Sequence, residues 1–267
     1  KNTGKDPAKA NWPSYYQFMN NQLTELLTNY GPIGCIWFDG VWDHDQDTPA
    51  FNWQLEEQYQ LIHKLQPACL IGNNHHKTPF QGEDIQMFER DLPGENKAGL
   101  SGQAISHLPL ETCETMNGMW GYRIYDKNYK SVSQLVQLLV RSAGKGANLL
   151  LNIGPQPDGK LPQASLDRLK GMGEWLAKNG ETIYATQAGP YSNKNYVSTQ
   201  RDNKIWLHIL NDSINNLTLA TSNKIKSICD YQTKQPIEFK KAKDSITIGN
   251  FTPSNKTDYI IEITVKK

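Results

Sequence analysis

The stretch from Ile33 to Gly40, which reads IGCIWFDG, decides the fold class of this sequence. Its apolar run is short, is bounded by glycines and ends in a carboxylate, which is typical of a buried strand with a polar group at its C-terminal end. Apolar residues at three-to-four spacing between Pro13 and Tyr30 predict an amphipathic helix just before it. The sequence therefore predicts a helix followed by a strand that presents Asp39 at its end.

The same alternation of helix and strand continues along the chain. A parallel sheet or an α/β barrel is the architecture that such alternation favours. The glycine- and proline-rich region 90–125 lacks a regular pattern and is predicted to form long irregular loops. The expected elements are a helix at 53–65, a strand at 68–71 that runs into GNNHH (72–76), a strand at 84–88, a helix that begins at Ser131, a strand at 148–153 and a helix at 162–178.

After about Tyr184 the helical period disappears and short alternating runs follow, which is typical of an antiparallel sandwich. The boundary is predicted around Gly189-Pro190, with an α/β barrel portion in residues 1–185 and a β-sandwich in residues 186–267. The expected strands lie at 204–210, 217–220, 225–231, 237–242, 245–251 and 259–265.

Composition excludes several classes of protein. The 28 lysines and arginines against 27 acidic residues leave a net charge of +1, which argues against a nucleic-acid or membrane-surface protein held by bulk charge. No apolar run approaches the roughly 20 residues of a membrane-spanning helix. The four cysteines stand singly and are predicted to be small buried hydrophobes.

Two groups of acidic residues are candidates for catalysis. Asp39 lies where α/β barrels place catalytic groups, although an Asp-Gly pair also serves as a turn cap. A charged cluster that includes Glu89, with Glu95 and Glu111 downstream, either lines a cleft or forms a solvated loop. If one of these glutamates faces Asp39, the two form the carboxylate pair that glycoside hydrolysis requires.

The adjacent histidines His75 and His76 suggest three alternatives. Neighbouring residues of an extended chain point to opposite faces, and no third ligand follows at a recognisable spacing, so we expect no metal site. A hydrogen bond to a sugar hydroxyl and a structural role remain open. The chain also has no phosphate-binding glycine loop and no G-x-S-x-G elbow, and no cofactor is expected.

Three motifs in a fixed order make the sequence recognisable. They are Ile36–Gly40 (IWFDG), Glu111–Thr115 (ETCET) followed by WGY at 120–122, and Asn148–Pro155 (NLLLNIGP) followed by Asp158-Gly159. Together they closely resemble the α-L-fucosidases of glycoside hydrolase family 29, over roughly Trp12 to Tyr191. By position and pattern, the later strands resemble that family's C-terminal β-sandwich.

The resemblance implies a retaining exo-hydrolase that removes terminal α-L-fucose by double displacement. Asp39 matches the family's nucleophile in its W-F-D-G context. The general acid/base is expected at Glu89, with Glu95 as the runner-up and Glu111 as a third choice. The segment around Glu89 resembles the subgroup that prefers α-1,3/1,4-linked fucose.

The resemblance also implies residues that bind the sugar. Trp37 and Trp120 resemble aromatics that line the fucose pocket, where the C5 methyl group needs an apolar wall. His75 lies near the place of a hydroxyl-binding residue.

The family carries a long segment ahead of the W-F-D-G strand, where this chain has few residues. We therefore expect a partial barrel that is completed by the missing N-terminal part of the same enzyme, its partner besides the fucosylated glycan. A periplasmic or secreted location is expected from the family. Two alternatives stay open: a retaining glycosidase for another sugar, such as a galactoside, and a carbohydrate-binding protein without turnover.

Overall fold

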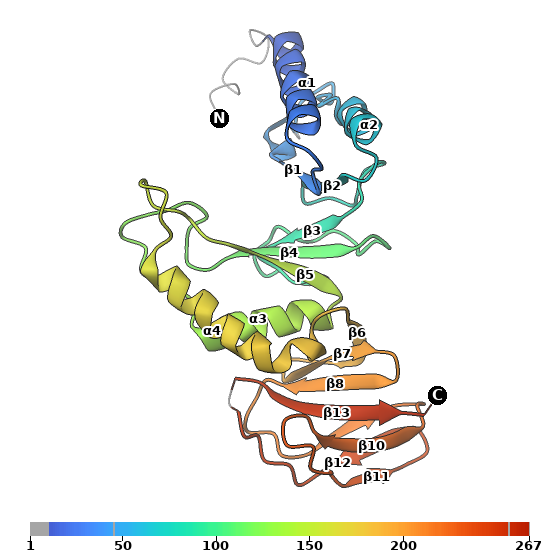
Figure 1. The fold of residues 1–267 in the computed structure, drawn as a ribbon. Helices are drawn as coiled ribbons and strands as arrows, with labels where there is room; N and C mark the ends of the chain where they lie inside the picture. The colour runs from blue at the N-terminus through green and yellow to red at the C-terminus, as the bar shows by residue number, and fades with distance from the viewer. Residues whose placement is uncertain (1–10, 45, 256, 267) are drawn as a thin grey trace. The chain divides into compact units, whose positions relative to one another are not determined.

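A computed structural model describes residues 11–44, 46–255 and 257–266 of the chain (Figure 1). The chain forms two compact units, Lys1–Thr112 and Cys113–Lys267. The strand β4 (Leu110–Thr115) spans the division between them.

The first unit begins with a helix and a strand, as the sequence predicts. Helix α1 (Trp12–Asn29) begins at Asn11, whose side chain accepts a hydrogen bond from the Ser14 N–H. The strand β1 (Cys35–Asp39) then pairs in parallel with β2 (Leu70–Asn74). Between these strands lie the short 3₁₀ helix η3 (Val41–His44) and helix α2 (Leu55–Leu65).

The two sides of β1 differ because successive side chains of a strand point to opposite faces. Phe38 is buried, whereas Trp37 and Asp39, on the other face, are exposed. Phe38 joins a core formed by both helices and both strands, which fixes the face on which Asp39 stands. The buried members of this core are Leu23, Leu27, Phe38, Tyr59, Ile62, Cys69 and Ile71.

The strand β3 (Gln86–Glu89) follows β2 in the first unit and carries Glu89 at its last position. A parallel bridge joins Gly72 to Ile85, and the carboxylate of Asp84 accepts a 2.9 Å hydrogen bond from the Ile71 N–H. These contacts tie the start of β3 to β2. Both strands therefore deliver their last residues, Asn74 and Glu89, toward Asp39.

The second unit contains helices packed on a sheet. Helix α3 (Val132–Gly144) starts with a capping box, in which Ser131 and Gln134 satisfy each other's backbone N–H groups. Strand β5 (Ala147–Asn152), helix α4 (Gln163–Asn179) and the 3₁₀ helix η4 (Gly180–Thr182) follow. Residues of α3 and α4, such as Leu135 and Trp175, share a buried cluster with strand residues such as Trp206.

Two antiparallel sheets complete the second unit. The larger has the strand order β10-β13-β8-β7-β6 and the smaller the order β11-β12-β9. Their bounds are β6 Gln187–Ser192, β7 Tyr196–Arg201, β8 Lys204–Ile209, β9 Leu217–Ala220, β10 Ile225–Asp230, β11 Phe239–Lys241, β12 Ser245–Ile248 and β13 Tyr259–Val265.

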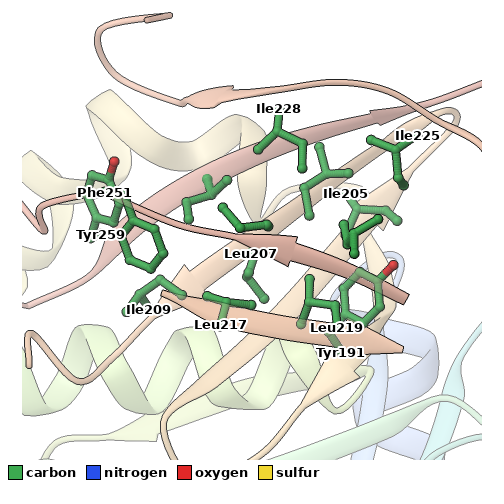
Figure 2. Packing of buried hydrophobic residues seen from close by; sticks show 14 residues of the cluster. Tyr191, Ile205, Leu207, Ile209, Leu217, Leu219, Ile225, Ile228, Phe251 and Tyr259 are labelled. Atoms are coloured by element: carbon green, nitrogen blue, oxygen red, sulfur yellow. The ribbon is translucent and has the colours of Figure 1, made fainter. Parts of the chain in front are cut away.

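The sheets enclose an apolar core. Residues of strands from both sheets point into it, among them Leu207 of β8, Leu219 of β9 and Ile228 of β10 (Figure 2). Phe251 and Tyr259 stack at one end, with ring centroids 5.7 Å apart. Short alternating runs in the sequence are the pattern on which the sandwich was predicted.

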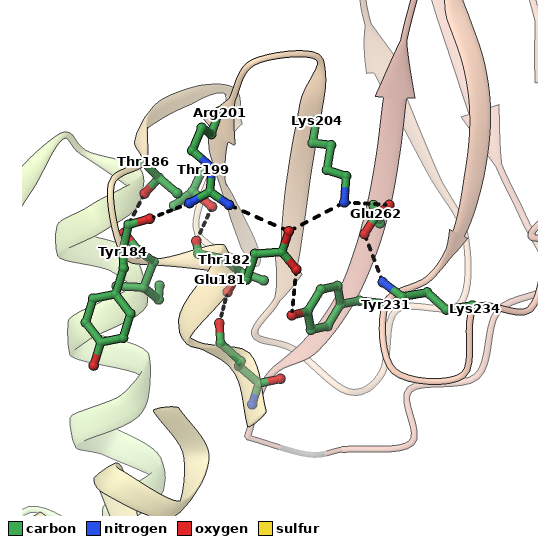
Figure 3. Close-up of polar contacts among 12 residues, drawn as sticks. Glu181, Thr182, Tyr184, Thr186, Thr199, Arg201, Lys204, Tyr231, Lys234 and Glu262 are labelled. Carbon is green, nitrogen blue, oxygen red and sulfur yellow. Dashed lines mark hydrogen bonds and ion pairs between the residues drawn. The ribbon is translucent and has the colours of Figure 1, made fainter. Parts of the chain in front are cut away.

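A polar network lies where η4 meets the larger sheet (Figure 3). Glu181 pairs with Arg201 of β7 at 3.6 Å and with Lys204 of β8 at 3.5 Å. Lys204 and Lys234 both reach Glu262 of β13, at 3.6 and 2.9 Å. The network therefore fastens the end of the helical segment to three strands.

The structure is a mixed α/β fold with sandwich-like antiparallel sheets. It corrects the prediction that residues 90–125 are irregular throughout, because β4 lies inside that region. The predicted strands at 217–220 and 259–265 are confirmed, whereas β6 and β7 lie in a stretch for which no strand was predicted. The predicted boundary between residues 185 and 186 stays a prediction.

Candidate active site

Asp39 and Asn74 end two paired parallel strands and lie opposite each other in the register. The Asn74 side-chain Nδ2 donates to Asp39 Oδ1 at 3.2 Å and to Glu89 Oε2 at 2.8 Å. Since both oxygens contact one nitrogen, they lie within about 6 Å of each other. The structure thus brings together the two carboxylates that the sequence analysis chose.

This spacing has chemical meaning. Carboxyl groups are about 5–5.5 Å apart in retaining glycosidases and about 6.5–9.5 Å apart in inverting ones. The limit set by Asn74 falls below the inverting range. One amide group therefore holds one oxygen of Asp39 and one oxygen of Glu89 close together.

His76 is the next residue in the cluster. Its Nε2 lies 2.9 Å from Glu89 Oε2, and its ring stacks on Trp42 with the planes 3° apart and the centroids at 5.0 Å. The backbone of His76 is left-handed, with φ at 60°, which is uncommon for a residue other than glycine. Such a conformation persists where surrounding contacts fix it, and those contacts aim the imidazole at Glu89.

The environment of Asp39 alters its acidity. Burial raises the pKa of the Asp39 carboxyl, and the negative charge of Glu89 adds to the rise. The hydrogen bond from Asn74 and the proximity of His76 lower the pKa of the same group. Asn74 is therefore the strongest single influence that keeps Asp39 ionised.

Glu111 lies beside Trp37. The indole Nε1 donates to Glu111 Oε1 at 3.1 Å, and Trp37 stands on the same face of β1 as Asp39. Burial raises the pKa of Glu111, and the bond from Trp37 opposes that rise. Glu95, in contrast, pairs with Lys97 at 2.6 Å and has no contact with Asp39 or Glu89 in the described part of the chain.

His75 is buried in a separate network. Its Nε2 lies 3.0 and 3.1 Å from the two oxygens of Glu83, and its Nδ1 accepts from the Lys77 N–H at 3.0 Å. Tyr59 also donates to Glu83, at 2.8 Å. Both nitrogens of His75 are therefore engaged, and the predicted contact with a sugar hydroxyl would require one of these bonds to break.

Trp120 lies in the second unit. Its carbonyl oxygen accepts a 2.7 Å hydrogen bond from Asn152 Nδ2 at the end of β5. This bond joins the WGY segment to the NIGP motif, two of the stretches on which the family resemblance rests. Its predicted role in sugar binding stays a prediction.

The described residues contain no group of three or more metal-binding side chains that could hold an ion. His75 and His76 contact different glutamates, Glu83 and Glu89. Within the same residues, no helix combines the length and apolar character needed to cross a bilayer.

Comparison with known proteins places this cluster in a family. A family profile described as Alpha-L-fucosidase matches residues 1–181. The chain belongs to the α-L-fucosidase family. This confirms the resemblance seen in the ordered motifs of the sequence.

Individual fucosidases agree with the assignment. The plasma α-L-fucosidase of Rattus norvegicus is 44% identical over 173 residues, which cover 62% of this chain and 35% of the rat protein. The α-L-fucosidase of Dictyostelium discoideum is 26% identical over 279 residues, covering 97% of this chain and 57% of its own length. The structure of α-L-fucosidase isoenzyme 1 from Paenibacillus thiaminolyticus is similar with a TM-score of 0.79 and 30% identity, over 98% of this chain and 66% of that one. The chain thus spans 57% of the length of the Dictyostelium protein and 35% of that of the rat protein.

Sequence reasoning missed two members of the cluster, Asn74 and His76. Both lie in the GNNHH stretch that was predicted to follow a strand. Because the carboxyl ends of adjacent parallel strands share one edge of a sheet, that position was a usable signal. The histidine chosen there, His75, points into the protein, and its neighbour lies beside the carboxylates.

Proposed function

We propose that this protein carries the catalytic carboxylates of an α-L-fucosidase that releases terminal α-L-fucose from glycans with retention of configuration. The observation that carries the proposal is the Asn74 amide held between Asp39 and Glu89, at the ends of neighbouring strands in a chain of this family. Their limited separation supports the retaining mechanism over the inverting one.

In the proposed first step, an Asp39 oxygen attacks the anomeric carbon of fucose while the bond to the leaving oxygen breaks. A carboxylic acid of the site gives its proton to that oxygen, so the remaining glycan leaves as an alcohol. In the second step the same group, now a carboxylate, takes a proton from water as the water oxygen attacks the anomeric carbon and the bond from that carbon to Asp39 breaks. Fucose is released, and ionised Asp39 and the protonated acid are regenerated.

Two glutamates compete for the acid/base role. Glu89 is favoured by geometry, because it shares the Asn74 amide with Asp39. Glu111 is favoured by its raised pKa: burial raises the pKa of its carboxyl, and a general acid must hold its proton near neutral pH. We propose Glu89 as the first choice and Glu111 as the alternative, which the experiment below separates.

Trp37 supplies an apolar surface in this proposal. The bond to Glu111 fixes its indole nitrogen, and the side chain is 38% exposed on the face that carries Asp39. A fixed ring of this kind suits the C5 methyl group of fucose, whereas a galactoside would place a hydroxymethyl there and need a polar partner.

The parallel pair of β1 and β2 with its alternating helices supports the proposal that the first elements belong to a (β/α)8-type barrel. The preference for α-1,3/1,4 linkages, the exported location and the completing N-terminal part stay predictions.

The test is hydrolysis of an aryl α-L-fucoside by wild type and by D39A, E89A, E111A and E95A, with and without azide, each in this chain and in a form extended N-terminally by the predicted rest of the barrel. D39A should lose at least about 10³-fold in kcat. Azide occupying the space of the missing carboxylate should then yield β-L-fucosyl azide. The acid/base variant should instead yield α-L-fucosyl azide, because azide attacks the fucosyl-enzyme from the opposite face.

A trapping experiment gives a readout that does not depend on turnover. Incubation with 2-deoxy-2-fluoro-α-L-fucosyl fluoride should label Asp39, which mass spectrometry of peptides would detect. The exposed Glu57 of α2 provides a control, since E57A should behave as wild type. An N-terminally extended wild-type protein that binds fucose but neither hydrolyses the fucoside nor becomes labelled would favour the carbohydrate-binding alternative.

A further inference from the structure

The carboxyl group of Glu89 makes its side-chain contacts through one of its two oxygens. Asn74 Nδ2 donates to Oε2 at 2.8 Å, and His76 Nε2 lies 2.9 Å from the same Oε2. Within the described residues, no hydrogen bond or ion pair reaches Oε1. The two oxygens of Glu89 are therefore not equivalent.

The surrounding charges fix which way the Asn74 amide points. Its Oδ1 is buried and has no hydrogen-bond partner in the part of the chain that the structure describes. With the amide turned round, this oxygen would face the oxygens of Asp39 and Glu89, which are acceptors when ionised. Because three acceptors would then repel one another, Nδ2 is the atom that faces both carboxyl groups. One lone pair of Glu89 Oε2 is thus occupied by an N–H donor.

His76 supplies the second contact to Oε2. The side chains of His76 and Glu89 are only 19% and 14% exposed, and a hydrogen bond shielded in this way is stronger than one in water. Trp42 stacks on the imidazole with the planes 3° apart, which restricts rotation of the ring. A carboxyl oxygen has two lone pairs, and Asn74 and His76 occupy both when Nε2 carries a hydrogen. The place for a proton on Glu89 is then Oε1.

We propose that His76 is a positioning residue that keeps the proton of Glu89 on Oε1, the oxygen left open to the substrate. The inference rests on the proposed function, in which Glu89 is the acid/base. In the first step the Oε1–H bond breaks, the proton passes to the leaving oxygen, and the electron pair of that bond stays on Oε1. In the second step Oε1 takes a proton from water, while Oε2 keeps both of its donors throughout.

The first test compares two fucosides that differ in their need for a proton. The phenol of 2-chloro-4-nitrophenyl α-L-fucoside leaves readily as an anion, whereas the phenol of phenyl α-L-fucoside depends more on the general acid. For both substrates kcat/KM reports the step in which the phenol leaves. A misplaced proton should therefore reduce kcat/KM for the phenyl substrate far more than for the other.

The key variant is H76G, which removes the imidazole without straining the left-handed backbone, where φ is 60°. It should reduce kcat/KM for the phenyl fucoside by about 10- to 100-fold and for the chloronitrophenyl fucoside by less than about threefold. H76Q, whose side-chain amide can donate to Oε2, should recover part of the loss. W42A, which removes the stacked ring, should give a smaller loss with the same dependence on the leaving group.

The matched control is His63 of α2, which also lies beside a carboxylate, with its Nε2 3.1 Å from Asp84 Oδ2. H63A should change the two kcat/KM values by the same factor. All variants are assayed in this chain and in the N-terminally extended form. If folded H76G loses activity equally toward both fucosides, its role is only structural and the proposal is overturned.

Nitrogen-15 NMR of the imidazole tests the hydrogen bond without turnover. We expect a protonated Nε2 in His76, assigned by the signal that H76G lacks, and a shift of this signal in E89Q. An Nε2 without a hydrogen would accept from a proton on Glu89 Oε2, which overturns the proposal. A His76 signal that is the same in E89Q and wild type overturns it as well.

The two proposals can fail separately. An extended wild-type protein that hydrolyses neither fucoside contradicts the proposed function, and the role of His76 fails with it even where NMR finds the bond to Glu89. An active wild type whose Nε2 carries no hydrogen, or whose H76G variant treats both fucosides alike, supports the hydrolysis and contradicts the role of His76.

Discussion

Asn74 is the residue on which the candidate site depends. It is nearly fully buried and ends the strand paired with that of Asp39. Its amide is therefore held in contact with the two carboxylates. Two carboxylates at this distance repel each other, which favours protonation of one of them. An amide that donates to both reduces the repulsion without adding a charge.

The first prediction concerns the pH dependence of N74A. Removing the amide removes the bond that lowers the pKa of Asp39, while burial and the charge of Glu89 continue to raise it. A nucleophile must be ionised, so the acidic limb of the kcat/KM profile should move to higher pH. The loss of a hydrogen bond to a charged group should also reduce kcat/KM by about 10- to 100-fold.

Carbon-13 NMR titration of the labelled Asp39 carboxyl would check the same pKa directly. N29A, at an exposed position in α1, provides the control and should leave the profile unchanged. An acidic limb that stays in place in N74A would show that the amide has no influence on the ionisation of Asp39.

The sequence allowed part of this site to be predicted. Asp39 could be chosen because it is a carboxylate at the end of a recognisable apolar strand, whereas the choice of Glu89 over Glu95 and Glu111 came from the family resemblance. The role of Asn74 depends on the register between β1 and β2, which is a tertiary property. The contact of His76 with Glu89 depends on a left-handed backbone at His76, which the sequence pattern does not predict.

At the scale of elements, strands with a regular apolar pattern could be predicted from the sequence, whereas strands with an irregular backbone could not. The bounds of β9 and β13 were predicted correctly; β9 alternates buried and exposed residues, and β13 is a largely apolar run. β6 contains Gly189 and Pro190, and its pairing with β7 shifts register between Ala188 and Ser192. Such a bulge interrupts the pattern that sequence reasoning follows.

The end of β5 shows how one element positions another. A Cβ atom on Gly154 would lie 2.4 Å from the backbone nitrogen of Tyr122 and 2.6 Å from the carbonyl carbon of Gly121. Asn152 also donates to the Trp120 carbonyl. The NIGP motif therefore needs glycine at 154 because the backbone of the WGY segment passes against it.

The second prediction is that G154A destabilises the second unit by about 2–3 kcal/mol. The contact atoms belong to backbone, so they cannot move aside as a flexible side chain does. Urea unfolding measures the loss, and a change in tryptophan fluorescence of the folded protein would report displacement of Trp120.

Gly173 in α4 is the matched control, because a Cβ there meets no atom within 4 Å. Since alanine is a better helix former than glycine, G173A should be neutral or stabilising by up to about 1 kcal/mol. Equal stability of G154A and wild type would contradict the close approach.

At the scale of the whole molecule, the net charge is only +1, so overall charge repulsion is small at neutral pH. Specific ion pairs then determine how stability changes in acid. The most connected of these in the described chain surround Glu181 and Glu262 in the second unit (Figure 3). Burial alone would raise the pKa of Glu262, but Lys234 and Lys204 outweigh it, and the net effect is a lowered pKa.

The third prediction follows from this direction. Because the pKa of Glu262 is lower in the folded than in the unfolded chain, unfolding in acid takes up a proton. The stabilisation is complete above the unfolded value near 4.5 and is lost as the pH falls through the lower folded pKa. E262Q should therefore reduce the free energy of unfolding by about 1–2 kcal/mol at pH 7 and by much less at pH 3.

Urea unfolding of wild type and E262Q at intervals from pH 3 to pH 7 measures this difference. E238Q, at an exposed position without an ion pair among the described residues, should follow wild type at every pH. If E262Q lost the same free energy at pH 3 as at pH 7, its effect would come from packing, and the ionised pair with Lys234 and Lys204 would not contribute. A difference that grows with pH up to about 5 and then stays constant is the signature of the carboxylate.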